Sequence, residues 1–360
     1  MAALVASLQR PNLDLNFWRG RQVLVTGHTG FKGAWLCQLL KRLGAKVHGV
    51  SLAPNTRPNL FELLNLSKEI DSRFIDIRNA AELYGVFQEQ QPEIVLHLAA
   101  QALVRPAYQD PPLTYSSNVM GTVNVLESIR NTRSVKLAIM VTTDKVYRNL
   151  ERAEAYCEDD QLGGYDPYSA SKAACELVID SYRNSFCNDA KISLVSVRAG
   201  NVIGGGDWAE DRLFPDLMRA WANSESVLIR RPNARRPWQH VLEPLSAYLL
   251  LAQYGFGNMA FSQAYNIGPD GSADVRTVAQ QAHALFGKGQ LEFASEPVGP
   301  HEAGLLALDA SKLRKALGLT PMWDLTTTVA RSVDWYRHFY EGDLARHLCD
   351  RDIDEYFGWK

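Results

Sequence analysis

The amino-acid sequence predicts an α/β fold: a doubly wound parallel sheet followed by a smaller, mostly α/β C-terminal domain. Three observations support this prediction. A glycine-rich turn follows the first apolar strand pattern, strand and helix patterns then alternate as far as residue 200, and the composition changes after that point. Strands that alternate with helices form parallel sheets with right-handed crossovers, because each helix returns the chain to the same end of the sheet.

The glycine-rich turn is the first element that can be justified. The apolar run 22–26 ends in Thr-Gly, and glycines recur at Gly27, Gly30 and Gly33 before a helical pattern begins. Glycines allow a tight turn and a close approach to a pyrophosphate, and the N-terminus of the next helix offers free N–H groups to phosphates. Because the spacing differs from G-x-G-x-x-G, the turn indicates a Rossmann-type dinucleotide site but leaves open a turn without a ligand.

The remaining elements follow from hydrophobic periodicity. Strand patterns occupy 22–26, 46–52, 72–77, 93–98, 136–141 and 192–198, and helical patterns occupy 31–43, 80–88, 112–130, 167–186 and 242–255. We expect residues 1–20 to form an N-terminal extension, 21–200 an NAD-binding domain and 201–360 a substrate domain. Residues 236–260 are expected to pack back on the first domain.

One residue that dinucleotide sites usually have is missing. An acid that binds the adenosine ribose normally follows the first glycine by about 20 residues, but the second strand ends in Ser51-Leu52-Ala53. Arg57, slightly further on, is either a partner for a 2′-phosphate or, as we favour, a solvated loop residue. The residues therefore leave open how tightly NAD is held and whether NADP is accepted.

Composition argues against several classes of function. The 360-residue chain has a net charge of -2, which gives no electrostatic footprint for nucleic acid. No apolar run approaches the roughly 20 residues that span a bilayer, and residues 1–9 lack the basic start of a signal peptide. Five cysteines without a C-x-x-C favour a reducing compartment over a disulfide framework or a zinc site. We therefore expect a cytoplasmic protein with no nucleic-acid, membrane or metal partner.

A tyrosine and a lysine carry the predicted chemistry. Tyr168 and Lys172 are four residues apart, on one face of the helix expected at 167–186. A phenol has a pKa of about 10, too high for a base at neutral pH, but a nearby ammonium and the positive ring of an oxidised nicotinamide both favour the phenolate. The alternative is a surface Tyr/Lys pair; the upstream glycines and Thr143 at a strand end favour the catalytic interpretation.

Several motifs together resemble a known family. They are T-G-x-T-G-F-x-G, H-L-A-A, T-T-D at the end of a strand, Y-S-A-S-K and R-A-G-N-V-I-G-G-G-D-W. In combination they resemble the extended short-chain dehydrogenase/reductase family and, within it, the nucleotide-sugar 4,6-dehydratases, over residues 18–340. The resemblance implies a lyase (a hydro-lyase) with NAD as its cofactor.

The segment Thr143-Asp144-Lys145 points to a subgroup. Dehydratases of the family usually carry Thr-Asp-Glu here, and the Lys version resembles the subgroup that acts on CDP-glucose. The same subgroup is resembled by the stretches 30–35, 101–106, 204–213, 236–244 and 301–303. The implied partner is thus a nucleotide-sugar substrate, CDP-glucose.

The implied reaction converts CDP-D-glucose to CDP-4-keto-6-deoxy-D-glucose and leaves NAD as it began. Tyr168 takes the proton of the sugar 4-hydroxyl, which Thr143 polarises, while hydride leaves C4. Water is then lost across C5 and C6, and the hydride returns to C6. Asp144 is the implied acid, and Lys145 is either the base at C5 or a residue that positions Asp144. Burial raises the pKa of an acid and lowers that of a lysine, as these roles require, although adjacent opposite charges act against both shifts.

The candidate site residues form three groups. The catalytic residues are Thr143, Asp144, Lys145, Tyr168 and Lys172. The cofactor-binding residues, in addition to Tyr168 and Lys172, are Gly27, Thr29, Gly30, Phe31, Lys32, Gly33, Asp76, Ile77, Leu98, Ala99 and Ala100. The substrate-binding residues are Gln101, Arg105, Asn201, Trp208, Arg212, Arg236 and His301.

Some of these residues have more than one interpretation. Arginine forks match diphosphate oxygens, which favours Arg212 and Arg236, yet any single arginine can be a solvated side chain. Trp208 either stacks on the base or belongs to the core. His28 and His97 are expected to have no role in proton transfer.

The resemblance also implies self-association. The two long helices expected at 112–130 and 167–186 resemble the pair through which family members dimerise as a four-helix bundle. Their apolar positions are too numerous for one buried face. We expect a homodimer, with a tetramer as the alternative.

Three other functions stay open from the sequence. A nucleotide-sugar 4-epimerase shares the glycine turn and the Tyr/Lys pair but needs no acid and base for elimination. A dehydratase could act on a dTDP-, UDP- or GDP-sugar. A non-catalytic NAD-sensing protein could dispense with Tyr168 and Lys172, which are both present.

Overall fold

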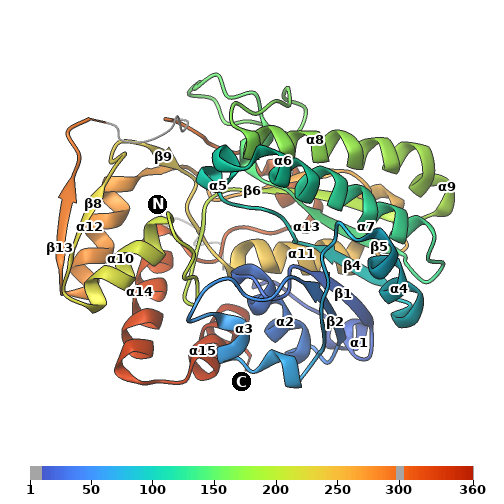
Figure 1. Cartoon of the computed structure of the whole chain (residues 1–360), viewed down its shortest axis with the longest axis horizontal. Helices are drawn as coiled ribbons and strands as arrows, with labels where there is room; N and C mark the ends of the chain where they lie inside the picture. The colour runs from blue at the N-terminus through green and yellow to red at the C-terminus, as the bar shows by residue number, and fades with distance from the viewer. Residues whose placement is uncertain (1–9, 297–303, 360) are drawn as a thin grey trace, which may run out of the picture.

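The chain is organised around a seven-stranded sheet (Figure 1). The computed structural model describes residues 10–296 and 304–359. The strand order is β11-β6-β5-β4-β1-β2-β3, and every neighbouring pair is parallel. The strands are β1 (Gln22–Thr26), β2 (Lys46–Ser51), β3 (Asp71–Phe74), β4 (Ile94–His97), β5 (Leu137–Val141), β6 (Ser193–Ala199) and β11 (Ala264–Ile267). The predicted doubly wound α/β class is confirmed, and the strand order reverses between β1 and β4, where open α/β sheets bind ligands.

Helices cover both faces of this sheet because its central strands are apolar on both sides. Val23 and Val25 of β1 belong to one core cluster and Leu24 to another, as the alternation of side chains along a strand requires. Helices α2 and α11 contribute to the first cluster, and α4, α7 and α8 contribute to the second. These helices are α2 (Phe31–Arg42), α4 (Ala80–Gln90), α7 (Gly121–Arg130), α8 (Pro167–Tyr182) and α11 (Leu242–Gly255).

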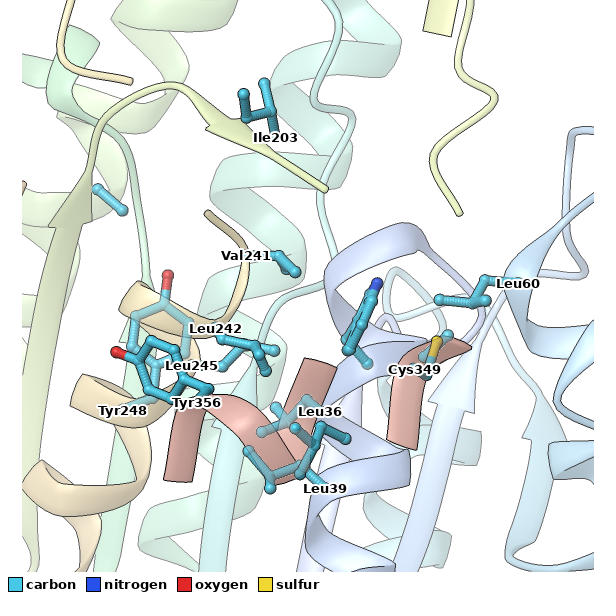
Figure 2. Close-up of a cluster of buried hydrophobic side chains, with 14 of the residues drawn as sticks. Leu36, Leu39, Leu60, Ile203, Val241, Leu242, Leu245, Tyr248, Cys349 and Tyr356 are labelled. Carbon is cyan, nitrogen blue, oxygen red and sulfur yellow. The ribbon is translucent and has the colours of Figure 1, made fainter. Parts of the chain in front are cut away.

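The first core cluster joins the two ends of the chain. Figure 2 shows Leu36 and Leu39 of α2 gathered with Leu242 of α11 and with Tyr356 of the last helix, α15 (Ala345–Phe357). The C-terminal helix therefore packs in the same core as the N-terminal strands and holds α2, which begins at the glycine turn, in place.

Residues after 200 form a smaller α/β region beside the sheet (Figure 1). Its strands pair in twos: β7 with β10, β8 with β13 and β9 with β12. The strands are β7 (Val202–Ile203), β8 (Ser226–Ile229), β9 (Arg235–Arg236), β10 (Gln239–His240), β12 (Ala273–Asp274) and β13 (Gln290–Phe293), and the helices are α10 (Leu213–Ala222), α12 (Val275–Phe286), α13 (Ser311–Leu317) and α14 (Leu325–Glu341).

Two elements after residue 200 belong to the large sheet. Helix α11 packs on β5 and β6, and β11 pairs with β6 as the seventh strand. The second half of the chain thus supplies the seventh strand of the large sheet and a helix that covers it. The domain boundary near residue 200 stays a prediction.

The third strand is shorter than the sequence indicates. It was expected at 72–77 but ends at Phe74, because its sheet partner β2 ends at Ser51, opposite Phe74. Asp76 and Ile77 therefore lie in the loop that follows the strand.

The two long helices each contain a π-helical turn. The first runs through α6 (Pro111–Tyr115), a π-turn at Ser116–Met120 and α7, and the second runs through α8, a π-turn at Arg183–Cys187 and α9 (Asn188–Ala190). Within residues 10–296 and 304–359, no helix is long and apolar enough to cross a membrane.

The expected N-terminal extension is described from residue 10 onward. It contains a short helix, α1 (Leu15–Trp18), which Asp14 caps by accepting from the backbone N–H of Asn16 at 2.8 Å. Trp18 is fully buried in the first core cluster. This part of the extension is thus packed on the sheet.

Two further short helices, α3 (Leu60–Leu63) and α5 (Val104–Gln109), follow β2 and β4.

Candidate active site

A cavity of about 860 Å³ opens at the carboxyl ends of the central strands. It is lined by the β1–α2 turn, by the residues after β4 and β5, by the start of α8 and by segments of the second half. Every site residue named from the sequence lines this cavity, apart from His301, which lies outside the described residues. The chain therefore brings together residues from both halves at the switch point of the sheet.

The glycine turn forms a tight cradle at one end of the cavity. Gly27 has a φ of 77°, and a Cβ added to it would lie 2.7 Å from the backbone N of Ala99. A Cβ on Gly33 would lie 2.1 Å from the carbonyl oxygen of Gly27, whereas Gly30, which caps α2, has only ordinary contacts. The first and third glycines are thus required by the backbone itself, and they present the N-terminus of α2 to the cavity. This arrangement fits a dinucleotide pyrophosphate.

The end of β2 offers hydroxyls in place of an acid. Thr29 Oγ1 lies 2.8 Å from Ser51 Oγ and donates to the carbonyl oxygen of Leu52 at 2.9 Å. The nearest sequence-predicted carboxylate is Asp76, after β3, which lines the cavity while accepting from Arg78 Nη2 at 2.6 Å. Arg57 is exposed and, among the described residues, is not part of the cavity lining, which fits the solvated-loop interpretation.

Helix α8 carries the tyrosine and the lysine into the cavity. The helix begins at Pro167, and its capping residue Asp166 accepts from the backbone N–H of Ser169 at 3.0 Å. This places Tyr168 in the first turn, where its phenol lies beside the Thr143 side chain. Lys172 lies one turn further on.

The environment of this pair sets its protonation. Burial raises the pKa of Tyr168 to about 12, and the neighbouring Thr143 hydroxyl and the charge of Arg212 only partly oppose that rise. Lys172 is buried and donates through Nζ to the carbonyl oxygen of Val141 at 2.9 Å. Burial lowers the pKa of Lys172, against the opposing influence of Cys175 and Glu176. An ionised tyrosine therefore needs additional positive charge in the cavity.

Asp144 is a buried carboxyl with a free oxygen. Its Oδ1 accepts from Thr143 Oγ1 at 3.0 Å, and its Oδ2 has no hydrogen-bond partner among the described residues. Burial raises the pKa of Asp144, although Lys145, Thr143 and more distant cations act in the opposite direction. When protonated, Asp144 can therefore donate through its unpartnered Oδ2 to a molecule bound in the cavity. Lys145, in the same short 3₁₀ turn, is half-buried and lines the cavity beside it.

Lys32 lies closer to the catalytic residues than a cofactor-loop role suggests. Burial, together with the charges of Arg212 and Lys172, lowers the pKa of Lys32 to about 8, while Asp144 and Asp207 oppose the shift. Lys32 was predicted only as a cofactor residue. Lys32 lies in the first turn of α2, lines the cavity, and is close enough to Asp144 and Lys172 for their charges to influence its pKa.

The arginines on the substrate side are held by two aspartates that the sequence analysis did not name. Asp211 Oδ1 lies 3.3 Å from Arg105 Nη1 and 2.8 Å from Arg230 Nη1. Asp207 pairs with Arg212 at 3.3 Å. All five side chains line the cavity, so three guanidinium groups from separate segments converge there. Both aspartates lie in or directly after the glycine-rich loop 201–208, and that position was the available signal.

Arg236 is the most deeply buried of the candidate arginines. It is 5% exposed, lines the cavity, and donates through Nη1 to the carbonyl oxygen of Arg235 at 2.8 Å. Its charge is close enough to lower the pKa of Asp144.

Three other predicted substrate residues differ in what their side chains do. Trp208 packs against Trp335 and Phe339 with ring centroids 5.9 and 5.3 Å apart, a geometry that favours the core interpretation. The side chain of Gln101 is occupied by the loop, donating to the carbonyl oxygen of Leu103 at 3.0 Å. Asn201 lines the cavity at the end of β6.

The two histidines near the cofactor loop are occupied by neighbouring hydroxyls. His28 Nε2 lies 2.7 Å from Ser72 Oγ, and His97 Nδ1 lies 2.7 Å from Thr26 Oγ1. Burial lowers the pKa of His28 to about 4 and that of His97 to about 3. Neutral, hydrogen-bonded imidazoles agree with the structural role expected for them.

Among the described residues, no group of three or more His, Cys, Asp or Glu side chains could hold a metal ion.

Comparison with protein families adds an independent finding. Residues 24–332 match the model described as GDP-mannose 4,6 dehydratase. A CDP-glucose 4,6-dehydratase of Salmonella typhimurium (strain LT2) is 45% identical over 352 residues, which cover 96% of this chain and 98% of the relative. A dTDP-glucose 4,6-dehydratase of Xanthomonas campestris pv. campestris is 27% identical over 335 residues, covering 87% and 92%.

A solved structure with bound cofactor has the same architecture. The UDP-glucose 4-epimerase of Thermus thermophilus, in complex with NAD, superposes with a TM-score of 0.76 at 26% identity. The match covers 88% of this chain and 98% of the epimerase. Both halves of the chain, and with them the cavity, are therefore within the shared fold.

Proposed function

The chain belongs to the GDP-mannose 4,6-dehydratase family, and on that premise we propose that it is a hydro-lyase that converts CDP-D-glucose to CDP-4-keto-6-deoxy-D-glucose with NAD as its cofactor. The observation that carries the proposal is the convergence of Tyr168, Lys172, Thr143 and Asp144 on one cavity, with a buried acid beside the tyrosine. The 45% identity to the Salmonella enzyme supports the choice of CDP-glucose among nucleotide sugars.

The glycine cradle supports NAD as the cofactor. The backbone at Gly27 and Gly33 leaves no room for a Cβ, and the free N-terminus of α2 suits a pyrophosphate. When bound, NAD supplies the hydride acceptor for C4 of the sugar and returns the hydride to C6. Thr29, Ser51 and Asp76, which all line the cavity, are the side chains that we propose would bind the adenosine ribose.

In the first step, Tyr168 takes the proton of the sugar 4-hydroxyl. Thr143, which lies beside the phenol, polarises the same hydroxyl. Since burial raises the pKa of Tyr168 to about 12, the phenolate requires the ammonium of Lys172 and the positive charge that the cofactor brings. The product of this step is a 4-ketone, which acidifies the C5 proton.

In the second step, Asp144 and Lys145 remove water across C5 and C6. Asp144, whose pKa is raised by burial, retains a proton that it donates to the departing 6-hydroxyl through its unpartnered Oδ2. Lys145 accepts the C5 proton. Lys145 returns a proton to C5, and the hydride returns to C6. The proton that Tyr168 took from the 4-hydroxyl replaces, by way of solvent, the one that Asp144 gave up, so the net change is the loss of one water.

The same residues weigh against the other two classes. The epimerase superposes on this chain, but an epimerase needs no buried proton donor beside Tyr168. A sensor needs neither the acid nor the Tyr/Lys pair. The arginines Arg105, Arg212 and Arg236 are proposed to hold the substrate diphosphate, because a planar guanidinium fork can donate to two phosphate oxygens at once.

We also propose that the protein is a cytoplasmic homodimer formed through its two long helices. Exposed apolar side chains occur along both: Leu113 and Met120 on the first, Leu177 and Phe186 on the second. Figure 1 shows these helices side by side on one side of the molecule. Exposed apolar side chains on adjacent helices support a helical interface.

The test is a comparison of substrates. The purified chain is incubated with CDP-glucose and, in parallel, with dTDP-, UDP- and GDP-sugars, with and without added NAD, and the products are weighed by mass spectrometry. We expect loss of one water from CDP-glucose alone. Loss of water from another nucleotide sugar would overturn the assignment of cytosine as the nucleotide base. An unchanged mass with an inverted 4-hydroxyl would favour an epimerase, and no reaction with any substrate would favour a sensor.

A further inference from the structure

A buried ion pair lies directly behind the candidate active site and has no role in the reaction proposed above. Glu176 of α8 and Arg198 of β6 are 3% and 5% exposed, and their side chains approach to 3.0 Å. Burying two charges costs free energy that a pair recovers only when further hydrogen bonds complete it. The partners in those further hydrogen bonds show which segment of the chain the ion pair fixes in place.

The carboxylate of Glu176 holds the start of the catalytic segment. It accepts from Thr142 Oγ1 at 2.5 Å and from Ser196 Oγ at 2.9 Å. Burial opposes ionisation of Glu176, but Arg198 and these donors keep its pKa below its usual value. Thr142 immediately precedes Thr143 and Asp144.

The guanidinium of Arg198 holds the end of the same segment. Its Nη1 donates to Tyr147 Oη at 3.0 Å and to the carbonyl oxygen of Glu158 at 2.9 Å. Tyr147, which is fully buried, donates in turn to Asn266 Oδ1 at 2.6 Å. Tyr147 follows directly after the 3₁₀ turn that contains Asp144 and Lys145.

Helix α8 contacts the same segment at three successive turns. Tyr168 lies beside Thr143, Lys172 donates to the carbonyl oxygen of Val141, and Glu176 accepts from Thr142. Residues spaced by four lie on one face of a helix. The helix that supplies the proposed base thus also fixes the segment that supplies the proposed acid.

We infer that Glu176 and Arg198 are positioning residues that clamp residues 142–147 at both ends, and so fix Thr143, Asp144 and Lys145 relative to Tyr168. This inference rests on the proposed function for its effect on turnover, but the clamp itself is a property of the folded chain. Neither residue lines the cavity, so each acts through Thr142 or Tyr147.

The test removes one hydroxyl, which donates to Glu176 and also lies 3.2 Å from the carbonyl oxygen of Val197, without removing a charge. Thr142→Val keeps the shape of the side chain and deletes the donor to Glu176, and Thr142→Ser keeps the donor. Ser193→Ala is the matched control, because Ser193 is a fully buried hydroxyl of β6 with no hydrogen-bond partner among the described residues. Amide hydrogen exchange of residues 141–147 is measured in the full chain, together with kcat and KM for CDP-glucose.

Thr142→Val should accelerate exchange in this segment by roughly tenfold and lower kcat by about 10–100-fold with KM changed by less than about twofold, because an error near 1 Å in catalytic geometry costs about that much. Thr142→Ser should restore both quantities, and Ser193→Ala should change neither. Unchanged exchange in Thr142→Val would overturn the clamp whatever the turnover.

Two further outcomes separate the clamp from the proposed function. Faster exchange in Thr142→Val with no dehydration by the wild-type chain would leave the clamp standing and remove the proposed function. A loss of turnover that Thr142→Ser fails to restore, or that falls entirely on KM, would contradict the positioning role. Glu176→Gln gives a second test from the other side of the bond and should accelerate exchange in the same segment.

Discussion

The phenol of Tyr168 must lose a proton before the proposed reaction can begin. Tyr168→Phe removes that proton acceptor and should lower the rate of C4 oxidation by about 10²–10⁴-fold, measured as the absorbance of reduced nicotinamide in a single turnover. Tyr254→Phe, which alters a half-exposed phenol of α11 away from the cavity, is the control. Equal oxidation rates in both variants would rule out Tyr168 as the base.

The same residue predicts the pH dependence. Burial raises the pKa of Tyr168 to about 12, so the ionised fraction of the free protein increases as pH rises towards that value. The wild-type rate of C4 oxidation in a single turnover should therefore increase with pH from 6 to 9, by up to about tenfold per unit where this ionisation limits the rate. A profile that is flat or falls over this range would contradict the assignment.

A change at Lys145 should affect the elimination step but not the oxidation step. Lys145→Ala should leave C4 oxidation intact but slow the exchange of the C5 hydrogen with solvent deuterium by about 10²-fold or more, as followed by mass spectrometry. Normal C5 exchange in this variant would exclude Lys145 as the base and leave it the role of positioning Asp144.

At the scale of an element, the β1–α2 turn is the most constrained part of the site. In Gly33→Ala, the new Cβ would meet the carbonyl oxygen of Gly27 at 2.1 Å, so strand and helix must separate. We expect loss of retained NAD and a lower midpoint of thermal unfolding. Gly30→Ala, whose nearest protein contact would be an ordinary 3.5 Å, is the control for folding. Equal unfolding midpoints for the two variants would show that the turn tolerates a side chain.

The elements themselves were predictable where local pattern decides them. Strand β1 and helix α11 end at the residues expected from periodicity, because an apolar run and a helical stripe define them without help from elsewhere. Strand β3 was predicted too long, since its end depends on where its partner β2 ends. Strand β11 was not predicted: its buried Asn266, held by Tyr147, interrupts the apolar pattern of a short segment.

In the candidate site, too, some residues could be predicted from local sequence and others could not. Residues that belong to contiguous motifs, such as Gly33, Tyr168 and Asp144, could be named from the sequence and line one cavity. Asp211, which pairs with Arg105 and Arg230, could not, because only the tertiary fold brings these segments together.

For the whole molecule, the exposed apolar side chains of the long helices predict self-association. Leu177 of α8 is 64% exposed, and Leu177→Glu should place a charge in the proposed interface and shift the mass measured by light scattering from dimer to monomer. Leu344→Glu alters a leucine of similar exposure at the start of α15 and should leave the mass unchanged. A wild-type monomer, or an effect of both variants alike, would contradict the helical interface.

The fate of one hydrogen tests the proposed reaction most directly. CDP-glucose labelled with deuterium at C4 is incubated with the chain in ordinary water, and the product is analysed for mass and for the position of the label. The proposed sequence of oxidation, elimination and hydride return predicts a product lighter by one water, with the deuterium retained at C6. Retention of water with the label still at C4, or loss of water with the label released to solvent, would contradict it.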